Sequence, residues 1–121
     1  MSFEIRCQSG IYAVNDLNEL DRLIQELIDT TGDATYWLCN GTEIITGFLF
    51  NGEQSTVYRY ADLASPINTD VDSDEVVKFT LENGELSEFH LCQCIKYDDA
   101  MAAFIHIAKT GELPTNIEWD T

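Results

Sequence analysis

Two Asn-Gly pairs, Asn40-Gly41 and Asn51-Gly52, separate three segments rich in aromatic and β-branched residues in the middle of the chain. Within residues 34–60 these segments are ATYWLC, TEIITGFLF and EQSTVYRY. Asn-Gly supplies the positive φ angles of a type I′ turn, whose twist matches that of the two antiparallel strands it joins. The spacing therefore predicts an antiparallel meander of three strands, around which the rest of the chain must fold.

Apolar residues occupy both faces of the first two segments. Successive strand residues point to opposite sides of a sheet, and strands that are apolar on both sides belong at its centre. We therefore expect the meander to form the middle of the sheet. The expected faces are Trp37 and Cys39 against Tyr36 and Leu38, and Ile45, Gly47 and Leu49 against Ile44 and Phe48.

Residues 17–28 have the apolar spacing of an amphipathic helix. Asp16, followed three residues later by Glu19, resembles a capping box, and Gly32 can end the helix. We expect its outer face to be an ordinary solvated surface. That face carries Glu19, Asp21, Arg22, Gln25 and Glu26.

A second helix is predicted near the end of the chain. Asp98 and Asp99 suit its N-cap and first turn, and Gly111 suits its end because glycine readily adopts the left-handed conformation found there. The tail then returns Trp119, which we expect to pack onto the fold because an indole is costly to leave in water. The buried stripe of this helix is expected to be Ala100, Phe104, Ile107 and Ala108.

The remaining segments complete a predicted α+β fold. Residues 3–7 alternate as a half-buried strand, residues 61–75 have no periodicity and are expected to be a loop, and VVKFTL and LSEFHL form two strands joined at Asn83-Gly84. We predict one domain over residues 1–121, a mostly antiparallel sheet of about five or six strands with two main helices packed against it.

The charge balance limits the partners of the chain. It has 22 Asp and Glu against 6 Lys and Arg, a formal net charge of −16. Such a field repels nucleic-acid phosphates and anionic lipid and attracts basic surfaces, so we expect neither nucleic acid nor membrane as a partner.

No apolar run approaches the ~20 residues of a membrane span, and no signal peptide is recognisable, so a cytoplasmic location is expected. Cys7, Cys39, Cys92 and Cys94 are expected to be reduced.

Two groupings resemble metal sites, but the first fails on residue identity and the second on spacing. Asp70, Asp72 and Asp74 match the first acids of a calcium loop, but Glu75 stands where the loop needs glycine and Leu81 where it needs a bidentate glutamate.

A second grouping places His90, Cys92 and Cys94 at alternate positions. On a strand they would be about 6.5–7 Å apart, too far to share one zinc ion at ~2.3 Å from each ligand. We expect no metal and no cofactor.

Motifs of nucleophilic, phosphate-binding or zinc-deaminase chemistry are absent from the sequence, and we expect no enzymatic activity. An enzyme that uses His106 or His90 with a carboxylate is one alternative. A second is a small-ligand or regulatory protein-binding module with a pocket lined by Trp37 and Phe48.

The closing segment resembles the C-terminal signature of a bacterial polymorphic-toxin immunity family, the first-numbered one, whose genes lie beside deaminase-type toxins. The resemblance is carried by Ala102, Ala103 and Phe104, then the run KTGELP at residues 109–114, and finally Ile117, Glu118 and Trp119. The preceding strand, helix and glycine-punctuated meander occur in the same order. This sequence is more acidic and richer in cysteine than the family pattern, which leaves the particular toxin open.

The resemblance implies an immunity protein that binds and neutralises a toxin domain acting on nucleic acid, a deaminase or a ribonuclease of the contact-dependent inhibition type. A toxin of this kind needs a basic cleft for its substrate, which an acidic surface can occupy. We expect tyrosines to act as amphipathic anchors beside the acidic loop. The expected partner-binding residues are Tyr58, Tyr60, Asp70, Asp72, Asp74 and Glu75.

Overall fold

The computed structural model describes residues 3–71 and 75–120 and confirms the α+β class. In chain order its elements are β1 (Phe3–Cys7), β2 (Gly10–Val14), the 3₁₀ turn η1 (Leu17–Glu19), α1 (Leu20–Thr31), β3 (Thr35–Asn40), β4 (Glu43–Phe50), β5 (Ser55–Arg59), β6 (Ser65–Ile67), β7 (Val76–Thr80), β8 (Leu86–His90), the 3₁₀ turn η2 (Leu91–Gln93), α2 (Tyr97–Thr110) and β9 (Glu118–Asp120).

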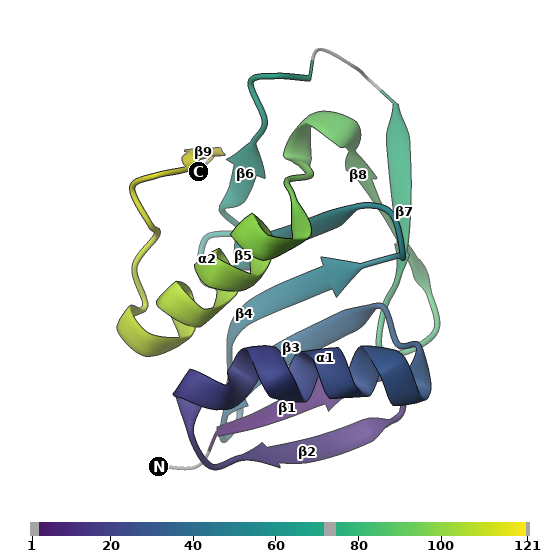
Figure 1. Cartoon of the computed structure of the whole chain (residues 1–121), viewed down its shortest axis with the longest axis vertical. Helices are drawn as coiled ribbons and strands as arrows, with labels where there is room; N and C mark the ends of the chain where they lie inside the picture. The colour runs from purple at the N-terminus through teal and green to yellow at the C-terminus, as the bar shows by residue number, and fades with distance from the viewer. Residues whose placement is uncertain (1–2, 72–74, 121) are drawn as a thin grey trace.

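The central sheet has five antiparallel strands in the order β2-β1-β3-β4-β5, and the predicted meander is its β3-β4-β5 part. Figure 1 shows α1 in front of the β1–β3 side of this sheet and α2 in front of the β4–β5 side. Both helices pack on the same apolar face. The expected arrangement of a mostly antiparallel sheet with two helices against it is therefore confirmed.

The first meander turn differs in detail from the predicted type I′ turn. Asn40 pairs with Glu43, so the two loop residues are Gly41 and Thr42. Gly41 has a φ of 63°, whereas Thr42 is not among the residues with positive φ. A type I′ turn needs positive φ at both loop positions. The positive φ angle at the first loop position still favours glycine, and Gly41 occupies that position.

Strand β3 is buried on both faces, as predicted. Tyr36 and Leu38 are fully buried in the core under the helices. Trp37 points to the opposite side, where its ring contacts Tyr58. Phe48 belongs to the core under the helices, so Trp37 and Phe48 lie on opposite faces of the sheet and do not line a common pocket.

One residue of the meander changes face. The pairing of β3 with β4 shifts between Leu38, opposite Thr46, and Cys39, opposite Ile44, which leaves Ile45 as an extra residue. Such a bulge turns the strand locally. Ile45 consequently packs against the core under the helices and does not share the face of Gly47, contrary to the simple alternation.

Both helices end at the predicted glycines, but α2 does not begin at the predicted acidic N-cap. Gly32 and Gly111 end α1 and α2 with φ angles of 70° and 73°, as predicted. The N-cap of α2 is Lys96, so Asp98 and Asp99 both lie in its first turn, where their charge is still favourable to the helix dipole. The whole expected stripe of α2 is buried.

The first helix begins with a 3₁₀ turn. Asp16 is the N-cap of η1, and its side chain accepts a hydrogen bond from the Asn18 N–H at 2.9 Å. The preceding strand β2 was not expected from the sequence, because the apolar run IYAV after Gly10 is short and has no alternation of polar and apolar residues. It forms one edge of the sheet and pairs with β1.

The predicted strands VVKFTL and LSEFHL form the hairpin β7–β8, which is a separate two-stranded sheet. Val77 and Phe79 pack with Leu49 in a second, smaller core on the face of the main sheet away from the helices. The Thr35 hydroxyl also donates to the Thr80 carbonyl at 2.6 Å. The main sheet is therefore covered by helices on one face and partly by a hairpin on the other.

Residues 61–75 are not wholly the loop that was expected. They contain β6, which pairs with β9 at the end of the chain. Pro66 lies opposite Trp119 in this ladder. Proline is tolerated there because the strand is at an edge. The local pattern is too short to reveal a strand whose partner lies about fifty residues away.

Trp119 packs against the core under the helices, as predicted, and its indole N–H donates to the Pro114 carbonyl at 2.9 Å. All four cysteines are free thiols, as expected. In the part of the chain that is described, no helix has both the length and the apolar character needed to cross a bilayer; α2 has 14 residues.

Candidate functional site

The acidic segment expected to contact a partner is described in part, because Asp72 and Asp74 lie outside the described residues. Asp70 is exposed, and its backbone N–H donates to the side-chain oxygen of Asn68 at 3.1 Å. Glu75 is also exposed, and its carbonyl accepts a backbone hydrogen bond from η2 at 2.8 Å. Asp70 and Glu75 thus lie on the surface where a partner can reach them.

The two tyrosines of the expected interface differ in accessibility. Tyr58 is half-buried between Trp37 and Phe89, with ring centroids 5.3 and 6.0 Å away, and burial raises the pKa of its phenol. Tyr60 directly follows the same strand and is 43% exposed, with its ring centroid 6.0 Å from that of Trp37. Tyr58 therefore contributes to sheet packing, while Tyr60 remains available as an anchor.

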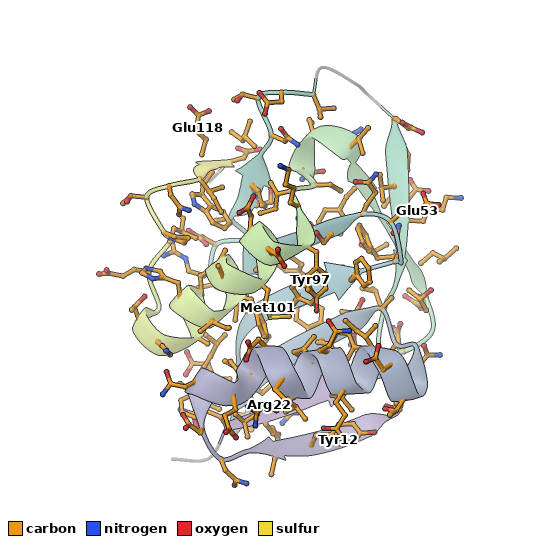
Figure 2. The ribbon with its side chains drawn as sticks, in the orientation of Figure 1. Tyr12, Arg22, Glu53, Tyr97, Met101 and Glu118 are labelled. Carbon is orange, nitrogen blue, oxygen red and sulfur yellow. The ribbon has the colours of Figure 1, made fainter. Side chains whose placement is uncertain are left out.

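A large depression of the surface lies elsewhere, between α1 and α2. It is a groove of about 860 Å³, open to solvent along one side. Its α2 wall is apolar and consists of Tyr97, Met101, Ala102 and Ile105, with Asp98 at one end. Residues four apart on a helix share a face, so Tyr97, Met101 and Ile105 form one row. Figure 2 shows Tyr97 and Met101 on the side of α2 that faces α1.

The α1 wall is polar and carries three acids against one arginine. Its side chains form two neighbouring rows with a spacing of four residues, so each row runs along the groove. All of these residues are exposed. They are Asp21, Gln25 and Asp29 in one row and Arg22, Glu26 and Thr30 in the other.

Polar contacts join the helical segments near both ends of the groove. The Tyr97 hydroxyl donates to the Gln25 side-chain oxygen at 2.9 Å, and the Gln25 amide donates to an Asp29 oxygen at 3.2 Å. Near the other end, the Lys109 ammonium donates to the side-chain oxygen of Asn18, in η1. The Tyr97–Gln25 bond joins the two walls of the groove, whereas Lys109 and Asn18 lie outside the residues that line it.

The electrostatic character of the groove is negative. Four carboxylates and one guanidinium line it, and Arg22 is itself only 3.6 Å from another acid, Glu19. The pKa of Tyr97 is raised, first by burial and then by the negative charges of Asp98, Asp29 and Asp21. The groove therefore combines an apolar wall with a potential that favours cations.

Part of this site could have been found in the sequence. Met101 and Ile105 widen the apolar face of α2 beyond the predicted stripe: Met101 belongs to the core under the helices, and Ile105 packs at the edge of that core. The acids of α1 were expected to be solvated, and they are. The sequence pattern of either helix alone does not show that these acids lie close to Met101 and Ile105, because that proximity depends on how the two helices pack on the sheet.

The histidines do not contribute to this groove. His90 and His106 are both exposed, and neither is among the residues that line it. Cys92 lies in η2 and Cys94 follows it, so the alternation with His90 is not that of a continuous strand. Among residues 3–71 and 75–120, no three His, Cys, Asp or Glu side chains are grouped so that they could hold a metal ion.

Comparison with protein-family models, with curated proteins and with solved structures finds no match to this chain. The site itself is therefore the basis for functional reasoning. An open groove with one apolar and one acidic wall can bind a cationic, partly apolar segment of another macromolecule. The residues that line it supply no arrangement of nucleophile, base and oxyanion donor.

Proposed function

We propose that this chain is an immunity protein of a bacterial polymorphic-toxin system of the contact-dependent growth inhibition type. It binds a cognate toxin C-terminal domain that acts on nucleic acid, a deaminase or a ribonuclease, and neutralises it by occluding its basic substrate cleft. In this role the protein performs no reaction and needs no cofactor. The sequence resemblance in residues 102–119 suggests the class.

The observation that carries the proposal is the acidic, apolar-walled groove on a protein of net charge −16. A toxin that grips phosphates presents clustered Lys and Arg, and these attract an acidic protein over a distance of about one Debye length, ~8 Å at physiological salt. Apolar contact then supplies the short-range part of the affinity. The same basic residues cannot serve substrate and inhibitor together, so binding prevents the reaction.

Co-expression tests this function directly. The variable C-terminal domain encoded by the neighbouring upstream gene is expressed in a bacterial host with and without this chain, and survival is scored. We expect growth only with the chain present, and a stable complex on gel filtration. A toxin domain inactivated at its catalytic residue serves as the control for expression and complex formation. Death in the presence of well-expressed, folded chain would rule out immunity against that toxin.

The same experiment distinguishes the immunity function from the alternative function. A small-ligand or regulatory module without a toxin partner would give no protection and no complex, and a metabolite or other protein would remain bound after purification. Mass spectrometry of the purified chain under native conditions detects such a ligand. We expect it to show the mass of the protein alone.

A further inference from the structure

We propose that the groove between α1 and α2 binds a basic amphipathic α-helix of the partner, with the apolar side of that helix against α2 and its Lys and Arg side chains against α1. This inference rests on the proposed function for the identity of the partner, but the fit between groove and helix can be tested without a toxin.

The dimensions of the groove suit a helix. The α1 residues that line the groove run from Asp21 to Thr30, roughly 14 Å at 1.5 Å per residue, so two to three turns of a partner helix lie beside them. The row of Tyr97, Met101 and Ile105 repeats every four residues. A partner helix with apolar residues at positions i, i+3 or i+4, and i+7 presents a matching row.

The chemistry of the two walls specifies the orientation and charge of the occupant. The partly exposed Tyr97 and Ile105 offer an apolar strip at the edge of the core, and the exposed Ala102 leaves room for a side chain of the partner. Met101 lies between them and is 6% exposed. Asp21, Glu26 and Asp29 line the opposite wall. A helix that is apolar on one side and cationic on the next satisfies both walls at once, which an acidic or uniformly polar segment does not.

The openness of the groove argues against a small molecule as the occupant. Pockets for small ligands bury most of the ligand surface and are usually enclosed. Here the space of about 860 Å³ is a trough between two helices that pack on the same face of the sheet, and the Tyr97–Gln25 hydrogen bond joins its walls. Adding a third helix to a helix pair is the simplest way to cover such a trough.

The test uses the full chain and two synthetic peptides of fourteen residues with identical Leu, Lys and Ala composition, blocked at both ends. One has its leucines on one helical side, and the other is scrambled so that no apolar side exists. Binding is measured by fluorescence anisotropy, and the contacted residues are identified from NMR shift changes. We expect the amphipathic peptide to bind at least tenfold more tightly and to shift Met101 and Ile105. Equal affinities, or no binding of either peptide, would overturn the proposal.

Matched variants locate the binding. D21N/E26Q/D29N removes three charges from the groove, and E53Q/E85Q/E88Q removes three exposed charges outside it. We expect at least a tenfold loss of amphipathic-peptide affinity with the first set and less than threefold with the second.

A second pair of variants tests the space in the groove. Ala102→Trp fills the groove and should abolish binding, whereas Trp at the exposed position 106, His106→Trp, should not. Circular dichroism checks that each variant is folded. Equal losses within either pair would show that charge alone, or another surface, binds the peptide.

The two proposals fail separately. If Ala102→Trp still protects cells against the toxin, the groove is not the toxin interface, although immunity stands. If the wild-type chain binds the amphipathic peptide selectively but protects against no toxin, the groove assignment stands and the immunity function does not.

Discussion

The indole ring of Trp37 lies against the backbone of Gly47, its cross-strand neighbour on β4. A Cβ atom added to Gly47 would lie 2.7 Å from Cζ3 of Trp37 and 2.9 Å from Cε3, closer than side-chain atoms approach one another. The ring is 8% exposed and is held by Tyr58, at 5.3 Å between centroids, and by a hydrogen bond from its N–H to Glu82. Gly47 thus provides the space in which Trp37 connects the main sheet to the β7–β8 hairpin.

Gly47→Ala should therefore destabilise the protein. The added methyl group displaces a ring that has neighbours on several sides, and overpacking of this kind costs about 2 kcal/mol. Urea unfolding followed by tryptophan fluorescence measures the loss. In the Trp37→Leu background the same substitution should cost less than about 1 kcal/mol, because the obstructing ring is gone. Equal costs in the two backgrounds would contradict this account of Gly47.

Leu63 is strained, because it has a φ of 55° in the turn between β5 and β6. Its side chain is 65% exposed, so it gains little from burial. A leucine in this left-handed region costs roughly 1–2 kcal/mol relative to its preferred conformations, whereas asparagine tolerates the region. The turn is held by the ion pair of Arg59 with Asp62 and by the Arg59 N–H to Ala64 carbonyl bond at 3.1 Å.

We expect Leu63→Asn to raise the free energy of unfolding by about 1 kcal/mol. Leu86 is the matched control, since it is 62% exposed but lies in strand β8, where no left-handed conformation has to be relieved. Leu86→Asn should therefore be neutral or destabilising. Thermal unfolding of both variants makes the comparison. A stabilisation of the same size at both positions would assign the effect to lost surface hydrophobicity rather than to relief of strain.

The sequence predicted those elements whose signals are local. The β3-β4-β5 meander, both helices and the β7–β8 strands each have turn residues and apolar periodicity within a few neighbouring residues. Gly32 and Gly111 could be assigned as helix ends because the left-handed conformation is specific to glycine at these sites. Local chemistry was sufficient for these features.

The missed features depend on distant residues. Strand β6 exists because β9 pairs with it, and the position of Ile45 depends on a bulge opposite Leu38 and Cys39. The groove likewise needs α1 and α2 to lie on the same face of the sheet at a fixed separation. The expected interface at Tyr58, Tyr60, Asp70 and Glu75 stays a prediction. The groove adds a second surface, of which only the α1 side was expected to be exposed to solvent.

The C-terminal tail should contribute measurably to stability through Trp119. Its ring packs against the core, and its N–H donates to the Pro114 carbonyl at 2.9 Å. Trp119→Ala removes both interactions and should cost about 2 kcal/mol, less than a fully buried aromatic ring because the residue is only partly buried. Trp119→Phe keeps most of the packing and should cost about 1 kcal/mol for the unpaired carbonyl. Urea unfolding of the three proteins checks this order, and a phenylalanine variant as unstable as the alanine variant would show that the hydrogen bond dominates.

Alkaline pH should destabilise the protein through its buried weak acids. Burial raises the pKa of the Cys94 thiol to about 11, from 9.0 for an exposed thiol, and raises the pKa values of Tyr36 and Tyr58 as well. The folded state then holds these protons more tightly than the unfolded state does. Their contribution is complete below pH 9, the unfolded thiol value, and is lost as the pH rises through the folded values.

Comparing Cys94→Ala with Cys92→Ala isolates the contribution of the buried Cys94 thiol to the pH dependence of stability. Cys94 is 2% exposed, whereas Cys92 is partly exposed. Between pH 8 and 10.5, under reducing conditions, we expect the free energy of unfolding to fall less steeply in Cys94→Ala than in wild type, by up to about 2 kcal/mol over the range. Cys92→Ala keeps the buried thiol and removes only the smaller effect of Cys92 on the pKa of Cys94, so its slope should stay closer to that of wild type than the slope of Cys94→Ala does. The net negative charge increases similarly in all three proteins, so general repulsion cancels in the comparison. Parallel slopes for wild type and Cys94→Ala would show that the Cys94 thiol titrates alike in the folded and unfolded chains.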